Sequence, residues 1–299
     1  MKTVLVTGAS GFVGGHIVRH LAEQGHRVFA TEHLTPIPDQ LKPYCETIIR
    51  NANTLNARHF LSALRHCDAV IHAAAHVPKN MMSLDSAGAC MTENAMATLS
   101  LAMAAKEADV KRFVYLSTAQ MYEHSKTGYL VNEEFFRIYP IGFGAAYFAS
   151  KWAGEVYANT VYQAGNNVIL RLGTVYGPGG SSVIDRFLAT VRSGGDLTVY
   201  GTGEAKFTPV WVGDVAEIAE KSLYDGKGIY NVVSGERWSV MGAALMAKSI
   251  AGSPAQTVKI DENATEGPTF APVSNELSRR QWQIKFKPLK EGLTLSTPA

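Results

Sequence analysis

Short apolar runs alternate with longer segments of helical periodicity over the first two-thirds of the chain. The run at 3–6 has the length of a buried strand, and the segment 12–24 after it carries Val13, Ile17 and Leu21 at helical spacing. Gly25 is placed to end that helix. The same reasoning predicts strands at 27–31, 47–50, 69–72, 113–117 and 168–172, and helices at 57–65, 83–107 and 147–163.

This alternation of strands and helices predicts an α/β fold. The strands pair in parallel, because each is separated from the next by a helical crossover. Right-handed crossovers then give a doubly wound sheet of the Rossmann type, with helices on both faces. We expect residues 1–173 to form one domain around this Rossmann-type sheet.

The pattern changes after Gly173, where glycine-rich turns become frequent. We expect residues 174–299 to form mainly a smaller substrate-binding domain, with strand 229–233 joining the sheet of the first domain. The tail after Gly292 is expected to be loose. Helices are predicted at 183–193, 215–225, 240–251 and 274–282.

Composition and charge exclude several functions. Of the 299 residues 46% are hydrophobic, and 28 basic side chains nearly balance 26 acidic ones. No basic patch for nucleic acid and no apolar run for a membrane span is evident. Because the N-terminus also lacks a signal-peptide pattern, we expect a cytoplasmic protein. The three cysteines, Cys45, Cys67 and Cys90, have neither disulfide nor zinc spacing, so no metal is expected.

Three glycines lie between the first strand and the first helix, in TGASGFVG. Gly8 permits a tight turn, Gly11 lets a pyrophosphate approach the backbone, and Gly14 lets the helix pack on the strand. The helix N-terminus supplies amide donors and the positive end of its dipole. This context predicts a dinucleotide site, rather than a merely tight turn.

Glu32 falls at the end of the second strand, about 20 residues after the glycine loop. A carboxylate there accepts hydrogen bonds from the adenosine ribose and repels a 2′-phosphate. We therefore expect NAD rather than NADP. The alternative is an ordinary surface glutamate, and His33 would soften the discrimination if it were protonated.

The G-x-x-G-x-x-G spacing resembles the extended short-chain dehydrogenase/reductase family, which includes UDP-sugar epimerases and dehydratases. The run CDAVIHAAA (67–75) is similar to the fourth strand of that family, whose small residues pass under the cofactor. Asn51 stands where the family usually has an adenine-binding aspartate. The resemblance places the cofactor against Gly8, Ser10, Gly11, Phe12, Val13, Gly14, Glu32, Asn51, Ala73, Ala74 and Ala75, and the substrate near His76.

Tyr147 and Lys151 lie at i and i+4 in a helical segment, so they share one helix face. An isolated tyrosine titrates near pH 10, too high for a base at neutral pH. A nearby ammonium and a positive nicotinamide ring both favour the phenolate and lower that pKa. This pair predicts a general base and a group that holds the nicotinamide ribose.

The resemblance supplies a third catalytic residue in FVYLSTAQMY (113–122). Family members carry Ser or Thr four residues before a tyrosine, here Thr118 before Tyr122, and its hydroxyl orients the reacting oxygen. Ser117 is the alternative and is also placed at the cofactor. Asn94 matches a family asparagine that supports the active site.

Two differences from the family narrow the chemistry. Sugar-nucleotide dehydratases carry Asp-Glu directly after this threonine, whereas this chain has Ala119 and Gln120, which cannot shuttle a proton. We therefore exclude a dehydratase. Fucose-synthase-like members carry a cysteine where Gln120 stands, which argues against that chemistry as well.

A further difference from the family concerns phosphate binding. RLGTVYGPGG (171–180) resembles the family segment before the substrate domain, but Thr174 replaces the usual asparagine. In VYGTGEAKFTPV (199–210), which begins at Val199, Phe207 replaces a diphosphate-binding arginine, and alternation turns Lys206 to the other face. Either other cations bind the diphosphate, or the substrate is not a standard UDP-sugar. Candidate replacements are Arg186, Arg192 and Arg237. The resemblance places the substrate against His76, Thr118, Thr174, Val199 and Phe207.

The leading hypothesis is an NAD-dependent epimerase of a nucleotide sugar, which oxidises a secondary alcohol transiently and returns the hydride. The alternatives are an NAD(P)-dependent dehydrogenase or reductase of a sugar-like alcohol, and a non-catalytic dinucleotide-binding protein. The resemblance also implies a homodimer, paired through helices at 92–107 and 147–163.

Overall fold

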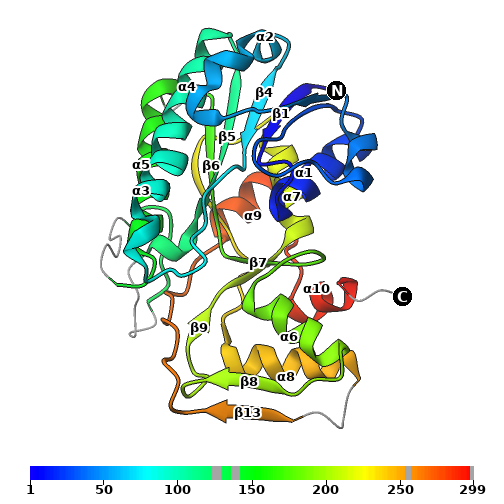
Figure 1. The fold of residues 1–299 in the computed structure, drawn as a ribbon, viewed down its shortest axis with the longest axis vertical. Helices are drawn as coiled ribbons and strands as arrows, with labels where there is room; N and C mark the ends of the chain where they lie inside the picture. Colours follow the sequence, from blue (N-terminus) through cyan, green and yellow to red (C-terminus); the bar gives the residue numbers. More distant parts are fainter. Residues whose placement is uncertain (123–128, 136–141, 164, 253–256, 297–299) are drawn as a thin grey trace. The chain divides into compact units, whose positions relative to one another are not determined.

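The computed structural model describes residues 1–122, 129–135, 142–163, 165–252 and 257–296 (Figure 1). The chain divides into two compact units that interleave along the sequence. The first unit comprises Met1–Met121, Tyr139–Arg171 and Val215–Tyr230. The second comprises Tyr122–Ile138, Leu172–Asp214 and Asn231–Ala299.

A seven-stranded sheet with the order β11-β6-β5-β4-β1-β2-β3 forms the centre of the first unit. β1 pairs in parallel with both β2 and β4, with Val4 opposite Val28 and Ala69. The chain therefore moves outward in one direction from β1 to β3 and in the other from β4 onward, so the switch point lies between β1 and β4. The strands are β1 (Thr3–Thr7), β2 (Arg27–Thr31), β3 (Thr47–Ile49), β4 (Ala69–His72), β5 (Arg112–Thr118), β6 (Asn167–Leu172) and β11 (Gly228–Val232).

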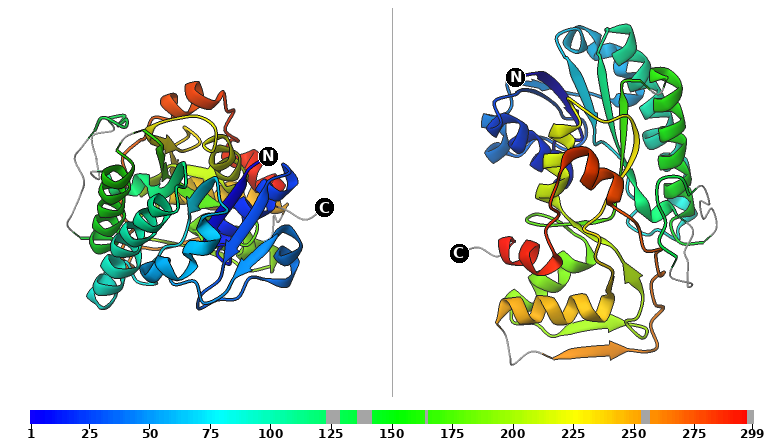
Figure 2. Two further views of the ribbon diagram at one scale, coloured as in Figure 1. Left: turned by 90° about the horizontal axis from the view of Figure 1, so that it is seen from above. Right: turned by 180° about the vertical axis from the view of Figure 1, so that it is seen from behind.

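Helices cover both faces of this sheet (Figures 1 and 2). All residues of β1, β4, β5 and β6 are buried, as expected for strands covered on both faces. Between α4, α5 and the sheet, Leu101, Tyr115 and Ala158 belong to one apolar core. The helices are α1 (Phe12–Glu23), α2 (Leu61–Leu64), α3 (Ala87–Ala89), α4 (Ala97–Glu107), α5 (Ala145–Tyr162) and α7 (Val212–Lys221).

Shorter turns of helix connect these elements. The 3₁₀ helices are η1 (Asp39–Tyr44), η2 (Thr54–Phe60), η3 (Leu84–Ser86) and η5 (Ala119–Met121), and η4 (Cys90–Met96) is a π-helix.

Among its described residues, the second unit contains three two-stranded sheets and four helices. β8 (Leu197–Tyr200) pairs in parallel with β13 (Val258–Asp261), β10 (Pro209–Trp211) in parallel with β7 (Thr174–Tyr176), and β12 (Trp238–Ser239) antiparallel with β9 (Lys206–Phe207). Ser182 begins one helix with a capping box that includes Asp185. The helices are α6 (Val183–Arg192), α8 (Val240–Ala251), α9 (Glu276–Trp282) and α10 (Leu289–Leu295).

Three predicted elements differ in the structure. The helix expected at 57–65 is the 3₁₀ helix η2 followed by the single turn of α2. The helix expected at 83–107 is instead η3, α3, η4 and α4 in succession, because the chain widens into a π-helix at Cys90–Met96. The prediction of a loose tail after Gly292 is wrong for the residues described. α10 continues to Leu295, and Leu289 and Leu293 are fully buried in the core of the second unit.

Within the described residues no helix is long and apolar enough to span a bilayer.

Candidate active site

The loop between β1 and α1 is shaped by close backbone contacts that only glycine allows. Gly8 has φ +67°, and a Cβ on it would lie 2.6 Å from the amide nitrogen of Ala74. A Cβ on Gly14 would lie 2.1 Å from the carbonyl oxygen of Gly8. The Gly11 amide donates to that same oxygen at 3.0 Å, so the turn is closed and rigid.

The N-terminus of α1 has the properties of an anion site. Gly11 is its N-cap and supplies no side-chain acceptor, and the first turn has no acidic residue. The first amides therefore keep free hydrogens, at the positive end of the helix dipole. These features fit the pyrophosphate of NAD. Ser10, Phe12 and Val13 are partly buried beside this turn.

Glu32 lies directly after β2 with its side chain 14% exposed. One carboxylate oxygen accepts from the amide of Ile37 at 2.9 Å, and the other is 3.3 Å from Nε of the exposed Arg50. Asn51, with φ 52°, is exposed next to this pair. An acidic and a basic side chain therefore meet where the adenosine ribose is predicted.

The end of β4 is fastened to the neighbouring elements. Ala73 and Ala74 are partly buried under Gly8, whereas Ala75 is exposed. Asn94, in the π-helix η4, accepts from the amide of His76 at 2.7 Å and donates to its carbonyl at 3.0 Å. The Asn94 side chain therefore fixes the conformation of the backbone at His76.

His76 also has a charged neighbour. Its Nδ1 is 3.6 Å from the Glu93 carboxylate, while its Nε2 is buried without a partner among the described residues.

α5 carries Tyr147 and Lys151 one turn apart, as predicted. Gly154 on the same helix lets α5 approach β5, since a Cβ there would lie 2.3 Å from the Tyr115 hydroxyl. Lys151 is 2% exposed, with its Nζ 4.2 Å from the centroid of the Tyr115 ring. Ser150 donates to the Tyr147 carbonyl at 2.7 Å and accepts from Asn94 at 2.9 Å. The helix that carries the predicted catalytic pair is thus joined to η4.

Burial determines the protonation of this pair in the protein alone. It lowers the pKa of the Lys151 ammonium to about 7, while the charge of Glu155 opposes the shift. It raises the pKa of the Tyr147 phenol to about 12. The sequence reasoning expected an ammonium and a nicotinamide to lower the pKa of Tyr147. In the protein alone desolvation dominates the pKa of Tyr147.

The two hydroxyls at the end of β5 have different partners. Ser117 donates to the Glu155 carboxylate at 2.5 Å, and Arg171 holds that carboxylate with two bonds of 2.6 and 2.9 Å. Thr118 accepts from the Gln120 amide at 3.1 Å and is 6% exposed. Ser117 is thus committed to a buried ion pair, which leaves Thr118 as the better candidate to meet a substrate oxygen.

Sequence reasoning missed His72 and Glu155. Glu155 lies four residues after Lys151, so the i, i+4 spacing that identified the pair offered a signal for the third residue. His72 gave no signal, because its partners Thr7 and Thr98 are remote in the sequence.

The predicted residues of the substrate domain lie in the second unit. The amide of Thr174, in β7, donates to the Thr208 carbonyl at 2.9 Å. Val199 and Phe207 are 0% and 4% exposed, and their side chains pack in apolar cores of this unit. Lys206 is exposed, so the predicted alternation is confirmed. A role of Thr174, Val199 and Phe207 in binding stays a prediction.

The three arginines considered as phosphate ligands all donate to backbone carbonyls. Arg186 bonds Ser181 at 3.0 Å, Arg192 bonds Ser296 at 2.7 Å and Arg237 bonds Phe270 at 2.8 Å.

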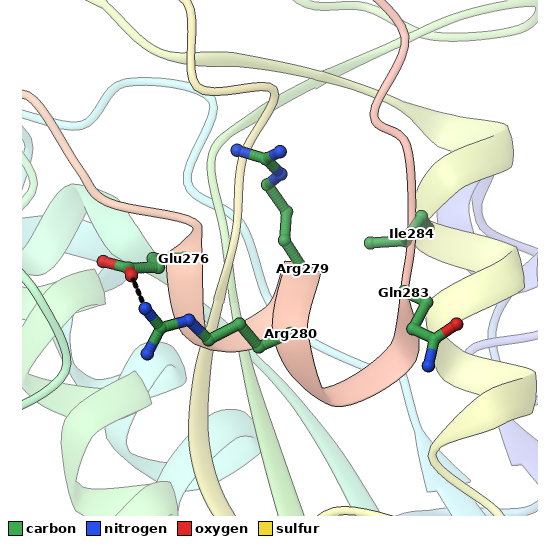
Figure 3. Close-up of a pocket in the computed structure, with 5 residues that line it drawn as sticks. All are labelled: Glu276, Arg279, Arg280, Gln283 and Ile284. Atoms are coloured by element: carbon green, nitrogen blue, oxygen red, sulfur yellow. Dashed lines mark ion pairs between the residues drawn. The ribbon is translucent and has the colours of Figure 1, made fainter.

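A hollow of about 410 Å³ lies beside α9, outside all predicted site residues (Figure 3). Figure 3 shows Arg280 paired with Glu276 and Arg279 directed away from that pair. Gln283 and Ile284 complete its lining. Among the described residues no three His, Cys, Asp or Glu side chains gather as metal ligands.

Comparisons with known proteins agree with this geometry. Residues 4–232 match the model of the NAD dependent epimerase/dehydratase family. A dTDP-4-dehydro-6-deoxy-D-allose reductase from a Streptomyces species is 28% identical over 98% of this chain and 94% of its own length. The crystal structure of UDP-glucose 4-epimerase from Thermus thermophilus with NAD is 27% identical, with a TM-score of 0.82 over 98% of this chain and 97% of that one. The UDP-glucose 4-epimerase of Thermotoga maritima, with UDP-glucose, has a TM-score of 0.86 at 22% identity over 98% of this chain and 97% of that one.

Proposed function

Because the chain belongs to the NAD-dependent epimerase/dehydratase family, an enzyme family whose cofactor is NAD, we propose that it epimerises a secondary alcohol of a nucleotide-linked sugar. The carrying observation is the buried Lys151 one turn after Tyr147, on a helix fastened to the end of β4. Thr118 completes the set at the end of β5.

The proposed roles follow from these positions. NAD supplies the hydride acceptor and donor when it is bound. Tyr147 takes the proton of the substrate hydroxyl and returns it later, as general base and then general acid. Thr118 holds the reacting oxygen, and Lys151 favours the phenolate form of Tyr147 when it is charged.

Ala119 and Gln120 argue against dehydration. They follow Thr118 directly, in η5, and neither side chain titrates. Removal of water needs an acid and a base beside the carbon next to the ketone. Redox chemistry at the alcohol remains the reaction that these side chains support.

A second candidate is a net reductase of a keto-sugar. The observation in its favour is the Streptomyces reductase, which aligns with nearly the whole chain at 28% identity. The same residues would then act once, with Tyr147 giving its proton to the new alcohol. An epimerase returns its hydride, whereas a reductase consumes NADH with every turnover.

The deciding experiment incubates the protein with UDP- and dTDP-hexoses and NAD, and with dTDP-4-keto sugars and NADH. Absorbance at 340 nm and product NMR are followed together. A new epimer without net NADH supports the epimerase, and stoichiometric NADH consumption supports the reductase. Conversion of neither class overturns both proposals.

Tyr147→Phe tests the assigned chemistry. It should lower turnover at least about 100-fold, the usual contribution of one general acid–base group. Tyr157→Phe, on the same helix, is the matched control and should retain activity. An active Tyr147→Phe enzyme would contradict the assigned role.

A further inference from the structure

A chain of buried hydrogen bonds crosses the first unit from the glycine loop toward the catalytic helix. Thr7, His72 and Thr98 are fully buried, and Asn94 is 1% exposed. His72 lies at the middle, with Nδ1 2.7 Å from Thr7 Oγ1 and Nε2 3.0 Å from Thr98 Oγ1. The proposed mechanism uses none of the first three side chains.

The end of the chain at Asn94 determines the direction of the bonds. The Asn94 backbone carbonyl can only accept, and Thr98 Oγ1 donates its one hydrogen to it at 2.5 Å. Thr98 must therefore accept from Nε2 of His72, which carries the hydrogen of the neutral ring. Nδ1 then accepts from the Thr7 hydroxyl, whose oxygen also accepts from the Ala74 amide at 3.3 Å.

Burial supports this assignment. It is the main cause that lowers the pKa of His72 to about 3, and the charge of Lys151 adds to it. A protonated ring would have two donors, and Thr7 could no longer donate to Nδ1. The neutral ring is thus the form that fits both neighbours.

Each end of the chain touches a part of the active site. Ala74 lies directly under Gly8, where even a Cβ would not fit, so a shift of its amide displaces the glycine loop. Thr98 bonds the backbone carbonyl of Asn94, and the side-chain amide of Asn94 bonds the backbone of His76 and the Ser150 hydroxyl. Ser150 in turn donates to the Tyr147 carbonyl. The imidazole joins Thr7 to Thr98 in this chain of bonds.

We infer that His72 is a positioning residue. As a neutral Nε2–H tautomer it fixes the position of the glycine loop relative to the helix that carries Tyr147 and Lys151. Loss of the Thr7 or the Thr98 hydroxyl should then change the structure at the opposite end of the hydrogen-bond chain. This inference rests on NAD binding and not on the particular reaction, so it is tested without the substrate.

The first measurement is long-range ¹⁵N NMR of histidine-labelled protein, with the His72 signals assigned by their loss in His72→Gln. The expected result is an Nε2–H ring that does not titrate between pH 8 and pH 5 and whose signals shift when NAD is added. A ring that titrates near its usual pKa, or carries its hydrogen on Nδ1, would overturn the inference.

The second measurement is NAD affinity by calorimetry in Thr98→Val, which removes the hydroxyl remote from the glycine loop. We expect roughly three- to tenfold weaker binding, and no such effect of Thr98→Val in a His72→Leu background. Tyr162→Phe is the matched control, because it removes a buried hydroxyl bond to Val110 in the same core but outside the chain. Equal effects of Thr98→Val in both backgrounds would show that the two ends act independently.

A rescue pair separates positioning from bulk stability. Asn places its amide where Nδ1 lies, and Gln reaches the position of Nε2. His72→Asn should keep the Thr7 bond and retain more NAD affinity, whereas His72→Gln should keep the Thr98 bond and lose more of it. The reverse order of affinities, or equal losses at equal thermal stability, would reject the assigned roles.

Discussion

At the scale of single residues, Glu32 and Arg50 would have opposite effects on a cofactor bound at the predicted adenosine site. The carboxylate favours ribose hydroxyls, whereas the exposed guanidinium suits a 2′-phosphate but is paired with that carboxylate. Glu32→Gln should lower the ratio of NADP to NAD dissociation constants by about five- to tenfold, since it removes a repulsion and frees Arg50. Calorimetric titrations with NAD and with NADP measure this ratio of dissociation constants. The double variant with Arg50→Ala should lose most of the gain, and an unchanged ratio in Glu32→Gln would place the ribose elsewhere.

The lowered pKa of Lys151 makes stability depend on pH. In the unfolded chain the ammonium titrates near 10.5, and in the folded protein near 7. Between these values the unfolded state binds more protons, so the stability deficit is fully present below pH 7 and shrinks as pH rises. The free energy of unfolding should gain up to about 1.4 kcal/mol per pH unit from pH 7 to pH 9, relative to Lys151→Met. Urea denaturation at several pH values checks this, and parallel curves for both proteins would contradict it.

The sequence predicted the residues whose chemistry is local. The glycine loop and the Tyr147–Lys151 pair are defined by spacings within one turn or one helix. His72 was out of reach, because its role depends on two hydroxyls brought together by the pairing of β1 with β4 and by the packing of α4. Phe207 was expected at the substrate in place of an arginine, and that its ring is part of an apolar core could not be seen from the local sequence.

At the scale of elements, α10 shows why the end of the chain was misjudged. Gly292 lowers helix propensity, but Leu289 and Leu293 are one turn apart and both fully buried, so packing outweighs propensity. Leu293→Ala should destabilise the protein by about 2–5 kcal/mol. Leu295→Ala is the control on the same helix, since Leu295 is 50% exposed and should change stability by no more than about 0.5 kcal/mol. Thermal and urea unfolding distinguish the two, and similar losses would deny that α10 is docked through Leu293.

The π-helix η4 could not be predicted from periodicity. Apolar spacing in 83–107 suits a continuous helix, and the local widening becomes visible only in the structure. It contains Asn94, whose amide serves both His76 and Ser150. Such widened turns are frequent at functional sites.

At the scale of the whole molecule, α4 and α5 pack side by side (Figure 1). Large apolar side chains on these two helices and at the end of η4 are exposed. Met96 and Met103 are 45% and 58% exposed, and Trp152 and Val156 are 47% and 43% exposed. Exposed apolar side chains on packed helices are typical of protein interfaces. We propose that a second copy of the chain covers these side chains.

Trp152→Glu should therefore convert a dimer to a monomer, since a charge at the centre of an apolar interface is left without a partner. Light scattering at micromolar concentration measures the mass of both proteins. Leu34→Glu, which changes a residue 84% exposed in a distant loop, should leave the mass unchanged. A monomeric wild-type protein would contradict the proposed dimer.

The position of β11 has a consequence for biosynthesis. β6 is fully buried between β5 and β11, yet β11 comes from residues 228–232, after the chain has already built much of the second unit. A ribosome therefore releases β6, whose mainly apolar sequence is NVILRL, while the row of amides and carbonyls that later faces β11 is still unpaired. Until β11 emerges, the nascent chain exposes an unpaired strand edge that is prone to aggregation. Shielding of this edge by a chaperone would matter most during that interval.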